Sequence, residues 1–372
     1  MNAPVIYAIG TAVPQYRIPQ EHHYAILESA NGLSRLEQLA LRKIYSRSGI
    51  SYRHSVLNEF ADADSPGNVL FHPSGNYENT SVAKRMQLYE KYAAGLCTEA
   101  AEACFATVPT VRREDVTHII TFSCTGMYAP GLDIHLIEQL GLQRNVERTC
   151  INFMGCYAAI NAIKSAYHIA RSQPDAVILI AGVELCSLHY RKSNDINQLV
   201  ANALFSDGAA AAIISAKEIA KAGNEMSLLL KDFYAEFEQS ASEEMIWRIG
   251  NDGFDLRLTP EVPMVVKHNI RGLAHKLFHK TGLQQSDVHY YAIHPGGVKI
   301  LEACEVALDI SKEENDISYH ILDNYGNMSS VTILFVLKEY LSRLSQKDIN
   351  KNILACAFGP GISMESMIVQ TC

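Results

Sequence analysis

An internal repeat constrains the fold of this 372-residue chain more than any other feature. Three pairs of segments match in the same order: DVTHII (115–120) with DVHYYA (287–292), Gly155-Cys156 with Gly326-Asn327, and FSDGA (205–209) with FGPG (358–361). One such match would be weak, but three in one order indicate a duplicated unit of roughly 170 residues. The chain is therefore expected to form two similar halves, 1–218 and 219–372, joined through the polar segment 217–224.

Expected strands and helices alternate along the first half, which is typical of an α/β fold. The apolar runs at 176–183 and 208–215 are continuous, as in strands of a sheet that is covered on both faces. The segment 54–80, rich in Asp, Pro, Gly and Asn, indicates loops. The other expected strands are 4–10, 118–123 and 149–153, and the expected helices are 33–45, 81–107 (with Ser81 as N-cap), 131–140 and 156–171.

Composition excludes several classes of function. The net charge is −8 and no basic run stands out, so a nucleic-acid partner is not expected. The first residues lack the features of a signal peptide, and no stretch is apolar for long enough to span a membrane. The nine cysteines form no CxxC pair and no zinc-like cluster with histidine, which indicates buried thiols in a reducing, cytoplasmic protein without a metal.

Three residues could carry chemistry, although each has an ordinary structural explanation when taken alone. Cys156 follows a glycine at the start of an expected helix, where the helix dipole favours a thiolate, but it could equally be a small core residue. His294 ends an apolar strand, where α/β proteins place ligands, and a buried, capped histidine is the alternative. Asn327 could simply be an N-cap.

The combination of the three is more informative. The repeat puts Cys156 and Asn327 at equivalent positions about a pseudo-twofold axis, with His294 beside them. A thiol, an imidazole and an amide are then expected to converge on one cavity. The imidazole could pair with the thiolate and lower the pKa of the thiol, and imidazole and amide together could donate to an oxyanion or enolate. Such a set suits acyl transfer followed by carbon–carbon bond formation.

Six segments, spread over almost the whole chain and in the right order, resemble the type III polyketide synthases, the chalcone synthase-like members of the thiolase superfamily. They are TGMYAPGLD (125–133), GCYAA (155–159), ALFSDGAAA (203–211), HPGG (294–297), YGNMSS (325–330) and FGPG (358–361).

The resemblance implies a homodimer of the thiolase fold, with two fused halves in α/β/α/β/α layers. Cys156 would take a starter acyl group from acyl-CoA, while His294 and Asn327 would bind malonyl-CoA and stabilise the enolate that forms on decarboxylation. Extension and cyclisation to a pyrone or a resorcinol would follow. Coenzyme A thioesters would be substrates, and no cofactor is expected.

The resemblance also assigns positions in the substrate cavity. Phe205 matches one gatekeeper phenylalanine, and Leu256 stands in place of the second. The remaining cavity positions are Cys124, Thr125, Cys186, His189 and Ser329. Lys43 and Arg47 match the region that contacts the phosphates of coenzyme A, and they share a helical face. The substitutions favour a non-flavonoid product, such as a pyrone or resorcinol grown from a fatty acyl starter.

Other enzymes and a non-enzyme remain as alternatives. A ketoacyl synthase III-like enzyme would use the same residue types but take its acyl group from an acidic carrier protein, and 42–47 is the basic cluster that could dock one. A thiolase would need a second catalytic cysteine where Asn327 stands, and the duplication argues against a cysteine protease. A non-catalytic scaffold would not become acylated at Cys156.

Overall fold

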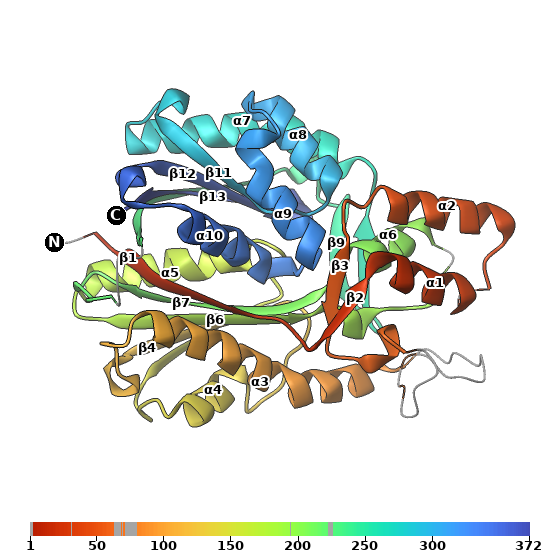
Figure 1. The fold of residues 1–372 in the computed structure, drawn as a ribbon, viewed down its shortest axis with the longest axis horizontal. Coiled ribbons are helices and arrows are strands. Elements are labelled where there is room, and N and C mark those ends of the chain that lie inside the picture. The colour runs from red at the N-terminus through yellow and green to blue at the C-terminus, as the bar shows by residue number, and fades with distance from the viewer. Residues whose placement is uncertain are drawn as a thin grey trace.

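The computed structural model describes residues 3–30, 32–62, 68, 70, 80–193, 195–221 and 226–372. Most of the predicted loop 54–80, and 222–224 of the predicted boundary segment, lie outside the described residues. Within the described part, the secondary structure falls into layers of helices and sheets with a smaller lobe at one end (Figure 1).

A nine-stranded mixed sheet runs through both halves in the order β11-β12-β13-β8-β1-β7-β6-β4-β5. The first half supplies β1 (Val5–Ala12), β4 (His118–Ser123), β5 (Glu147–Asn152), β6 (Val177–Leu185) and β7 (Asp207–Ser215). The second half supplies β8 (Leu228–Phe237), β11 (Val288–Ile293), β12 (Asn352–Gly359) and β13 (Ser363–Thr371). A short antiparallel contact between β1 and β8 joins the halves.

The two halves have the same pattern of strand directions. In the first half β4 is parallel to β6, β6 is antiparallel to β7, and β7 is antiparallel to β1. In the second half β11 is parallel to β12, β12 is antiparallel to β13, and β13 is antiparallel to β8. The sequence repeat therefore corresponds to a repeated topology, as predicted from the matching segments.

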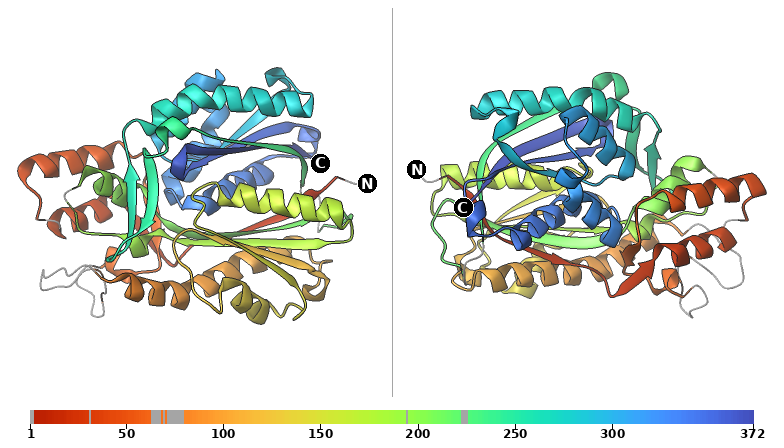
Figure 2. Two further views of the ribbon diagram at one scale, coloured as in Figure 1. Left: turned by 180° about the vertical axis from the view of Figure 1, so that it is seen from behind. Right: turned by 45° about the horizontal axis from the view of Figure 1, so that its top comes forward.

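Helices cover both faces of each half-sheet and complete five layers (Figure 2). The outer helices are α3 (Val82–Thr107) and α4 (Leu132–Leu140) on one side, and α7 (Val262–Thr281) and α8 (Val298–Leu308) on the other, while α9 (Asp316–Tyr325) buries Ile317 and Ile321 in the central apolar cluster. The central layer is α5 (Ala158–Ser172) and α10 (Thr332–Arg343). The expected α/β/α/β/α architecture is thus confirmed.

The central helices show why this layering forms. Residues of α5 that are fully buried include Ala158, Ala162, Ala166 and Ala170, whose small side chains let the helix lie close to both half-sheets. In α10 the segment 332–337 is buried on every side, as expected of a helix enclosed by protein. One apolar cluster joins both helices to both half-sheets, and two further clusters lie under the outer helices.

A smaller lobe covers one end of the layers and appears at the right of Figure 1. It contains α1 (Gln20–Ala30), α2 (Arg35–Ser46), α6 (Ile196–Leu204) and two hairpins, β2 (Tyr16–Pro19) with β3 (Tyr52–Ser55) and β9 (Met245–Ile249) with β10 (Phe254–Leu258). Buried Arg53 ties the lobe together by donating to the carbonyls of Asn202, Ala203 and Phe205 at the end of α6. No helix among the described residues is long and apolar enough to cross a membrane.

Candidate active site

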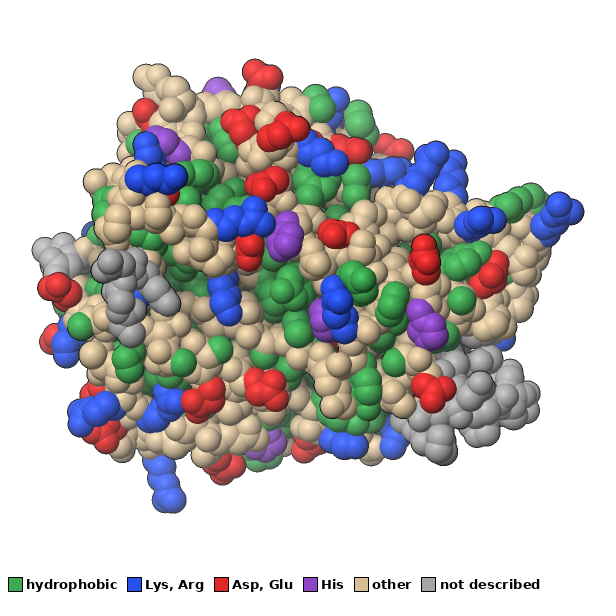
Figure 3. Space-filling view, in the orientation of Figure 1, with side chains coloured by type: hydrophobic (Ala, Val, Ile, Leu, Met, Phe, Trp, Pro, Cys, Tyr) green, Lys and Arg blue, Asp and Glu red, His purple; other side chains and the backbone are tan. Residues whose placement is uncertain are grey.

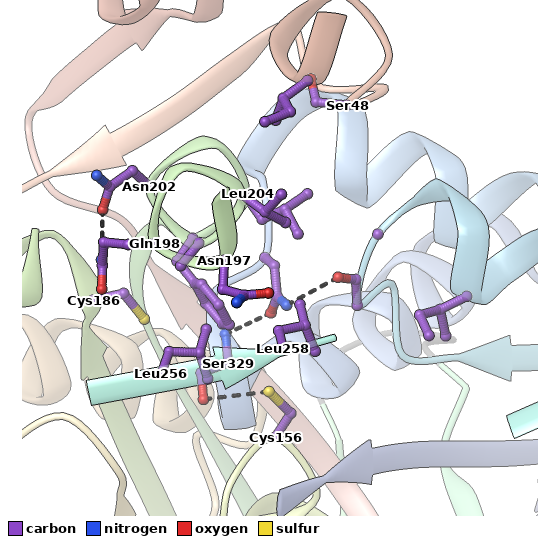
Figure 4. Close-up of a pocket in the computed structure, with 18 of the residues that line it drawn as sticks. Ser48, Cys156, Cys186, Asn197, Gln198, Asn202, Leu204, Leu256, Leu258 and Ser329 are labelled. Atoms are coloured by element: carbon purple, nitrogen blue, oxygen red, sulfur yellow. Dashed lines mark hydrogen bonds between the residues drawn. The ribbon is translucent and has the colours of Figure 1, made fainter. Parts of the chain in front are cut away.

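One cavity of about 830 Å³ lies between the layers and the smaller lobe (Figure 4). All twelve residues singled out from the sequence line it. They are Lys43, Arg47, Cys124, Thr125, Cys156, Cys186, His189, Phe205, Leu256, His294, Asn327 and Ser329. The cavity is therefore shared by the thiol, the imidazole and the amide that the repeat was expected to bring together.

Cys156 lies in a tight turn between β5 and α5. Gly155, just before it, has φ of +92°, and a Cβ atom at this position would stand 2.2 Å from Cδ of Pro360, so only glycine fits. The backbone N–H of Gly155 donates to the Cys124 thiol, with 2.9 Å between nitrogen and sulfur. The thiol of Cys156 has its own contact with the Ser329 hydroxyl, 3.6 Å from sulfur to oxygen.

Two expectations for Cys156 are wrong. The predicted helix 156–171 begins at Ala158, so Cys156 precedes the helix instead of opening it. The pKa of its thiol is raised to about 12, mainly by burial and further by the charge of Glu184, whereas a lowered pKa was expected from pairing with His294. No hydrogen bond joins the two side chains among the described residues.

His294 follows the last residue of β11, and its backbone N–H donates to the carbonyl of Cys356 over 2.8 Å. Both ring nitrogens are buried and have no hydrogen-bond partner among the described residues. Burial lowers the pKa of the ring to about 3, so the imidazole is neutral near pH 7. A neutral imidazole can donate one hydrogen bond and accept another, which leaves both functions available to a substrate.

Asn327 makes more hydrogen bonds than Cys156 or His294. It follows Gly326, whose φ is +69°, and precedes a short 3₁₀ helix (Ser329–Val331) instead of opening α10 directly as predicted. Its backbone N–H donates to Leu204 and its carbonyl accepts from Ser206, over 3.0 and 2.9 Å. Its side-chain amide accepts from the Ser329 N–H at 2.8 Å and donates to the Gly296 carbonyl at 3.4 Å.

Glu184, at the end of β6, is a site residue that the sequence reading missed. Its carboxylate is fully buried and accepts from the Cys124 backbone N–H, the Thr125 hydroxyl at 2.7 Å and the Ser330 hydroxyl. It therefore connects the β4 turn of the first half to the asparagine turn of the second. An acidic residue inside the apolar run 176–185 was the signal that could have identified it.

The two ring nitrogens of His189 are already engaged by the backbone. One lies 2.6 Å from the Thr125 carbonyl, and the other accepts from the Phe254 N–H at 3.3 Å. Because one partner can only accept and the other can only donate, the ring is neutral, and burial lowers its pKa to about 3. His189 thus contributes shape to the cavity, and its nitrogens are not free for a substrate.

Trp247, the chain's single tryptophan, lines the cavity and was not among the residues singled out from the sequence. Its indole N–H donates to the Cys124 carbonyl at 2.8 Å, and its ring packs edge-on against His189 and Phe254. It stands on β9 directly opposite Leu256 on β10, so the hairpin carries both side chains into the cavity. The turn Gly250-Asn251-Asp252-Gly253 between the strands is a recognisable hairpin signal.

The remaining residues singled out from the sequence also line the cavity. Phe205 caps the end of α6, and Cys186 follows β6 with a pKa raised well above that of an ordinary thiol by burial. Lys43 and Arg47 line the end of the cavity that is bordered by α2, far along the chain from the cysteine turn. No cluster of residues suited to a metal ion occurs among the described residues.

Comparison with known protein families shows which family the chain belongs to. Residues 2–218 match the N-terminal domain of chalcone and stilbene synthases, and residues 234–372 match the C-terminal domain. The chain belongs to the chalcone and stilbene synthase family. It is therefore a type III polyketide synthase, a condensing acyltransferase, and it has the thiolase fold of its structural neighbours.

Relatives come from distant organisms. The chain is 28% identical over 364 residues to the alpha-pyrone synthesis polyketide synthase-like Pks18 of Mycobacterium tuberculosis, covering 98% of this chain and 90% of that protein. It is 30% identical over 372 residues to type III polyketide synthase 21 of rice (Oryza sativa subsp. japonica), covering 98% and 93%.

Solved structures agree in fold over the full length. The crystal structure of PKS-I from the brown alga Ectocarpus siliculosus matches with a TM-score of 0.92 and 29% identity, covering 100% of this chain and 99% of that one. The C-terminal type III domain of Steely1, a type I/III hybrid from Dictyostelium, matches with a TM-score of 0.88 and 25% identity, covering 99% of each chain.

Proposed function

We propose that this polyketide synthase loads an acyl group from acyl-CoA onto Cys156, extends it with malonyl-CoA by decarboxylative condensation, and cyclises the product to a pyrone or resorcinol. The observation that carries the proposal is that Cys156, His294 and Asn327 line one cavity. The family assignment favours this reading over a ketoacyl synthase III-like enzyme.

Loading is a thioester exchange. The Cys156 sulfur attacks the carbonyl carbon of the acyl-CoA, the carbon–sulfur bond to coenzyme A breaks, and the thiol proton passes through His294 to the departing thiolate. Because the pKa of the thiol is raised to about 12 and that of the imidazole is lowered to about 3, both groups start neutral. The proton therefore moves as the substrate carbonyl becomes an oxyanion, not before.

Extension uses the amide and the imidazole together. The carboxylate of malonyl-CoA leaves as CO₂, and its bonding electron pair becomes an enolate whose oxygen accepts hydrogen bonds from His294 and Asn327. The enolate carbon attacks the acyl carbonyl on Cys156, forming a carbon–carbon bond and releasing the cysteine thiolate. Asn327 suits this role because its amide is already oriented by Ser329 and Gly296.

Cavity shape supports a long or flexible acyl chain. The cavity has a volume of about 830 Å³ and is lined both by Lys43 and Arg47, where coenzyme A phosphates would bind, and by Trp247. Leu256 stands where a phenylalanine would narrow the cavity, and the name of the mycobacterial relative refers to α-pyrone synthesis. We therefore place a fatty acyl-CoA first among the starters and a pyrone first among the products.

The working form is proposed to be a cytoplasmic homodimer. β5 is an edge strand that pairs only with β4 among the described strands, and most of its side chains are exposed, so it offers a surface to a second copy. All nine cysteines are free thiols, which suits a reducing compartment. Sedimentation equilibrium of the purified protein would give the dimer mass, and a monomer at every concentration would contradict this part of the proposal.

The test is to incubate the protein with malonyl-CoA and a series of acyl-CoA starters, and to analyse both the protein and the products by mass spectrometry. We expect an acyl adduct on Cys156 together with released pyrones or resorcinols. The adduct should vanish in Cys156→Ala and persist in Cys186→Ala, which removes another thiol of the same cavity. Acylation from a carrier protein but from no coenzyme A ester would replace the proposal with the carrier-dependent alternative.

A further inference from the structure

Helix α2 carries an exposed apolar ridge at the end that points away from the body of the molecule. Leu36 is 79% exposed and Leu39 is 57% exposed, and Leu36 is the most exposed large apolar side chain among the described residues. The opposite face of the helix buries Leu41 and Tyr45 and anchors it to the lobe. Single exposed leucines are ordinary, but two at i and i+3 on a projecting helix form a patch.

Cations surround this patch. Arg35 and Arg42 are exposed beside the leucines, and Lys43 and Arg47 follow toward the cavity. None of these four side chains forms a salt bridge within the described part of the chain. The single carboxylate of the helix belongs to Glu37, which accepts from the Ser34 N–H in a capping box at 2.7 Å.

The same helix borders the cavity. Ala40, Lys43, Ile44 and Arg47 line the cavity, so the ridge that starts at Leu36 ends at the cavity mouth. At a rise of 1.5 Å per residue the distance along the helix from Leu36 to Arg47 is about 16 Å. Figures 1 and 3 show this helix on the protruding end of the molecule, with apolar and basic side chains next to one another.

We propose that the outer face of α2 docks on an anionic lipid bilayer, with Leu36 and Leu39 inserted among the acyl chains and Arg35 and Arg42 on the lipid phosphates. A basic helix that exposes leucines is suited to the membrane interface, where apolar burial and attraction to anionic headgroups add. A projecting tip can enter a bilayer without a complementary surface, whereas a protein partner would need a matching groove. The net charge of −8 makes attraction depend on this local cluster.

Docking in this way places the cavity mouth near the bilayer surface, where long-chain acyl thioesters partition. Delivery of these thioesters from the bilayer to the cavity rests on the proposed function, but the membrane contact itself does not. The contact is peripheral and needs no spanning helix.

The experiment is co-sedimentation of the full chain with vesicles, without any coenzyme A ester. Vesicles of phosphatidylcholine alone are compared with vesicles that also contain phosphatidylglycerol. We expect binding to the anionic vesicles, weakened by salt, and at least about a tenfold loss of partitioning in the double variant Leu36→Gln/Leu39→Gln. The matched control is Val306→Gln/Ile349→Gln, which removes exposed apolar side chains elsewhere (61% and 39% exposed) and should bind as the wild type does.

Equal binding by the wild type and the leucine variant, or no preference for anionic vesicles, would overturn the proposal. Binding to an acidic acyl carrier protein in place of vesicles would also overturn it and would assign the surface to a protein. Acylation of Cys156 by a short, soluble acyl-CoA is measured in parallel and should be the same in all variants. A failure of that acylation speaks against the proposed function alone, because the vesicle assay does not use it.

Discussion

The two glycine turns at the centre of the molecule occupy equivalent places in the two halves but hold their side chains differently. At Gly326 the asparagine is fixed by two backbone and two side-chain hydrogen bonds. At Gly155 the backbone is held by the Cys124 thiol, while the sulfur of Cys156 lies 3.6 Å from the Ser329 hydroxyl and also interacts with the Asn327 amide. The amide is thus rigid and the nucleophile comparatively free.

This difference follows from what each group would do. A donor that stabilises developing charge works best when its orientation is set before the reaction, because reorientation during the reaction costs free energy. A nucleophile must instead move toward the carbonyl carbon and then release it. The two copies of the duplicated turn therefore suit different roles, one that holds a donor in a fixed orientation and one that lets a nucleophile move.

The largest effect is expected when the thiol of Cys156 is removed. Cys156→Ala should abolish acylation and product formation, a loss of at least about 10³-fold, because no other group in the proposed mechanism can form the thioester. Intact-protein mass spectrometry with a labelled acyl-CoA measures it. A labelled acyl group still bound to this variant would refute the assignment of the nucleophile.

The second prediction concerns the Asn327 amide in the turn at Gly326. Asn327→Ala should slow the decarboxylation of malonyl-CoA by about 10²–10³-fold and change loading much less, because in the proposed mechanism the amide stabilises the enolate of the extension step. Release of labelled CO₂ and acylation of Cys156 are measured separately. His294→Ala serves as the comparison, since it should impair both steps. Equal losses of both steps in the asparagine variant would contradict the division of roles.

A third prediction concerns the carboxylate that connects the turns. The charge of Glu184 contributes to the raised pKa of the Cys156 thiol, so Glu184→Gln should lower that pKa and increase the thiolate fraction at any given pH. Below the pKa the thiolate fraction rises about tenfold for each unit by which the pKa falls, and alkylation by iodoacetamide, followed from neutral to alkaline pH, should become roughly threefold to fourfold faster per unit because a less basic thiolate is a weaker nucleophile. In the wild type the rate should still be rising at alkaline pH, because the pKa is about 12.

The control for this prediction is Glu365→Gln. Glu365 is another buried carboxylate, but it is paired with Lys164, 2.6 Å away. The variant Glu365→Gln should therefore leave the alkylation rate of Cys156 unchanged. Unchanged alkylation in Glu184→Gln would contradict an electrostatic contribution of this carboxyl group to the pKa of the thiol.

The smallest expected effect lies outside both turns. Leu256→Phe should narrow the cavity and shift the products toward shorter chains while leaving loading of a short starter intact, because position 256 is on the hairpin and not in either turn. Chromatography with mass spectrometry of the products measures the shift. An unchanged product profile would mean that this side chain does not limit the growing chain.

Much of the fold could be predicted from the sequence because the core is strongly patterned. The strand His118–Ser123 was predicted with its observed bounds, and Ser81 caps α3 as expected, since its hydroxyl accepts from the Lys84 N–H. The repeat also predicted that Cys156 and Asn327 lie close together, and both line one cavity. These successes rest on apolar periodicity and on glycine, whose requirements are local.

The failures depended on tertiary environment. The pKa of Cys156 could not be read from its place in the chain, because burial and the charge of Glu184 outweigh any benefit from a nearby helix start. Likewise, His189 lines the cavity, but the engagement of its ring nitrogens by Thr125 and Phe254 could not be predicted, because these two residues are remote from it in sequence. Hydrogen-bond satisfaction between distant segments has no signature in a single sequence.

The bridge between Phe205 and Asn327 has a consequence for how such enzymes diversify. The backbone of Asn327 is hydrogen-bonded on both sides of Phe205, so a mutation that shifts the α6 end also shifts a residue of the proposed reaction. Among the described residues, Leu256 and Leu258 pair with Trp247 and Met245 and have no backbone bond to Cys156, His294 or Asn327, although both line the cavity. Selection for a new product can therefore vary these two leucines with less effect on the proposed reaction than Phe205, and the specificity of descendants should diverge fastest at positions 256 and 258.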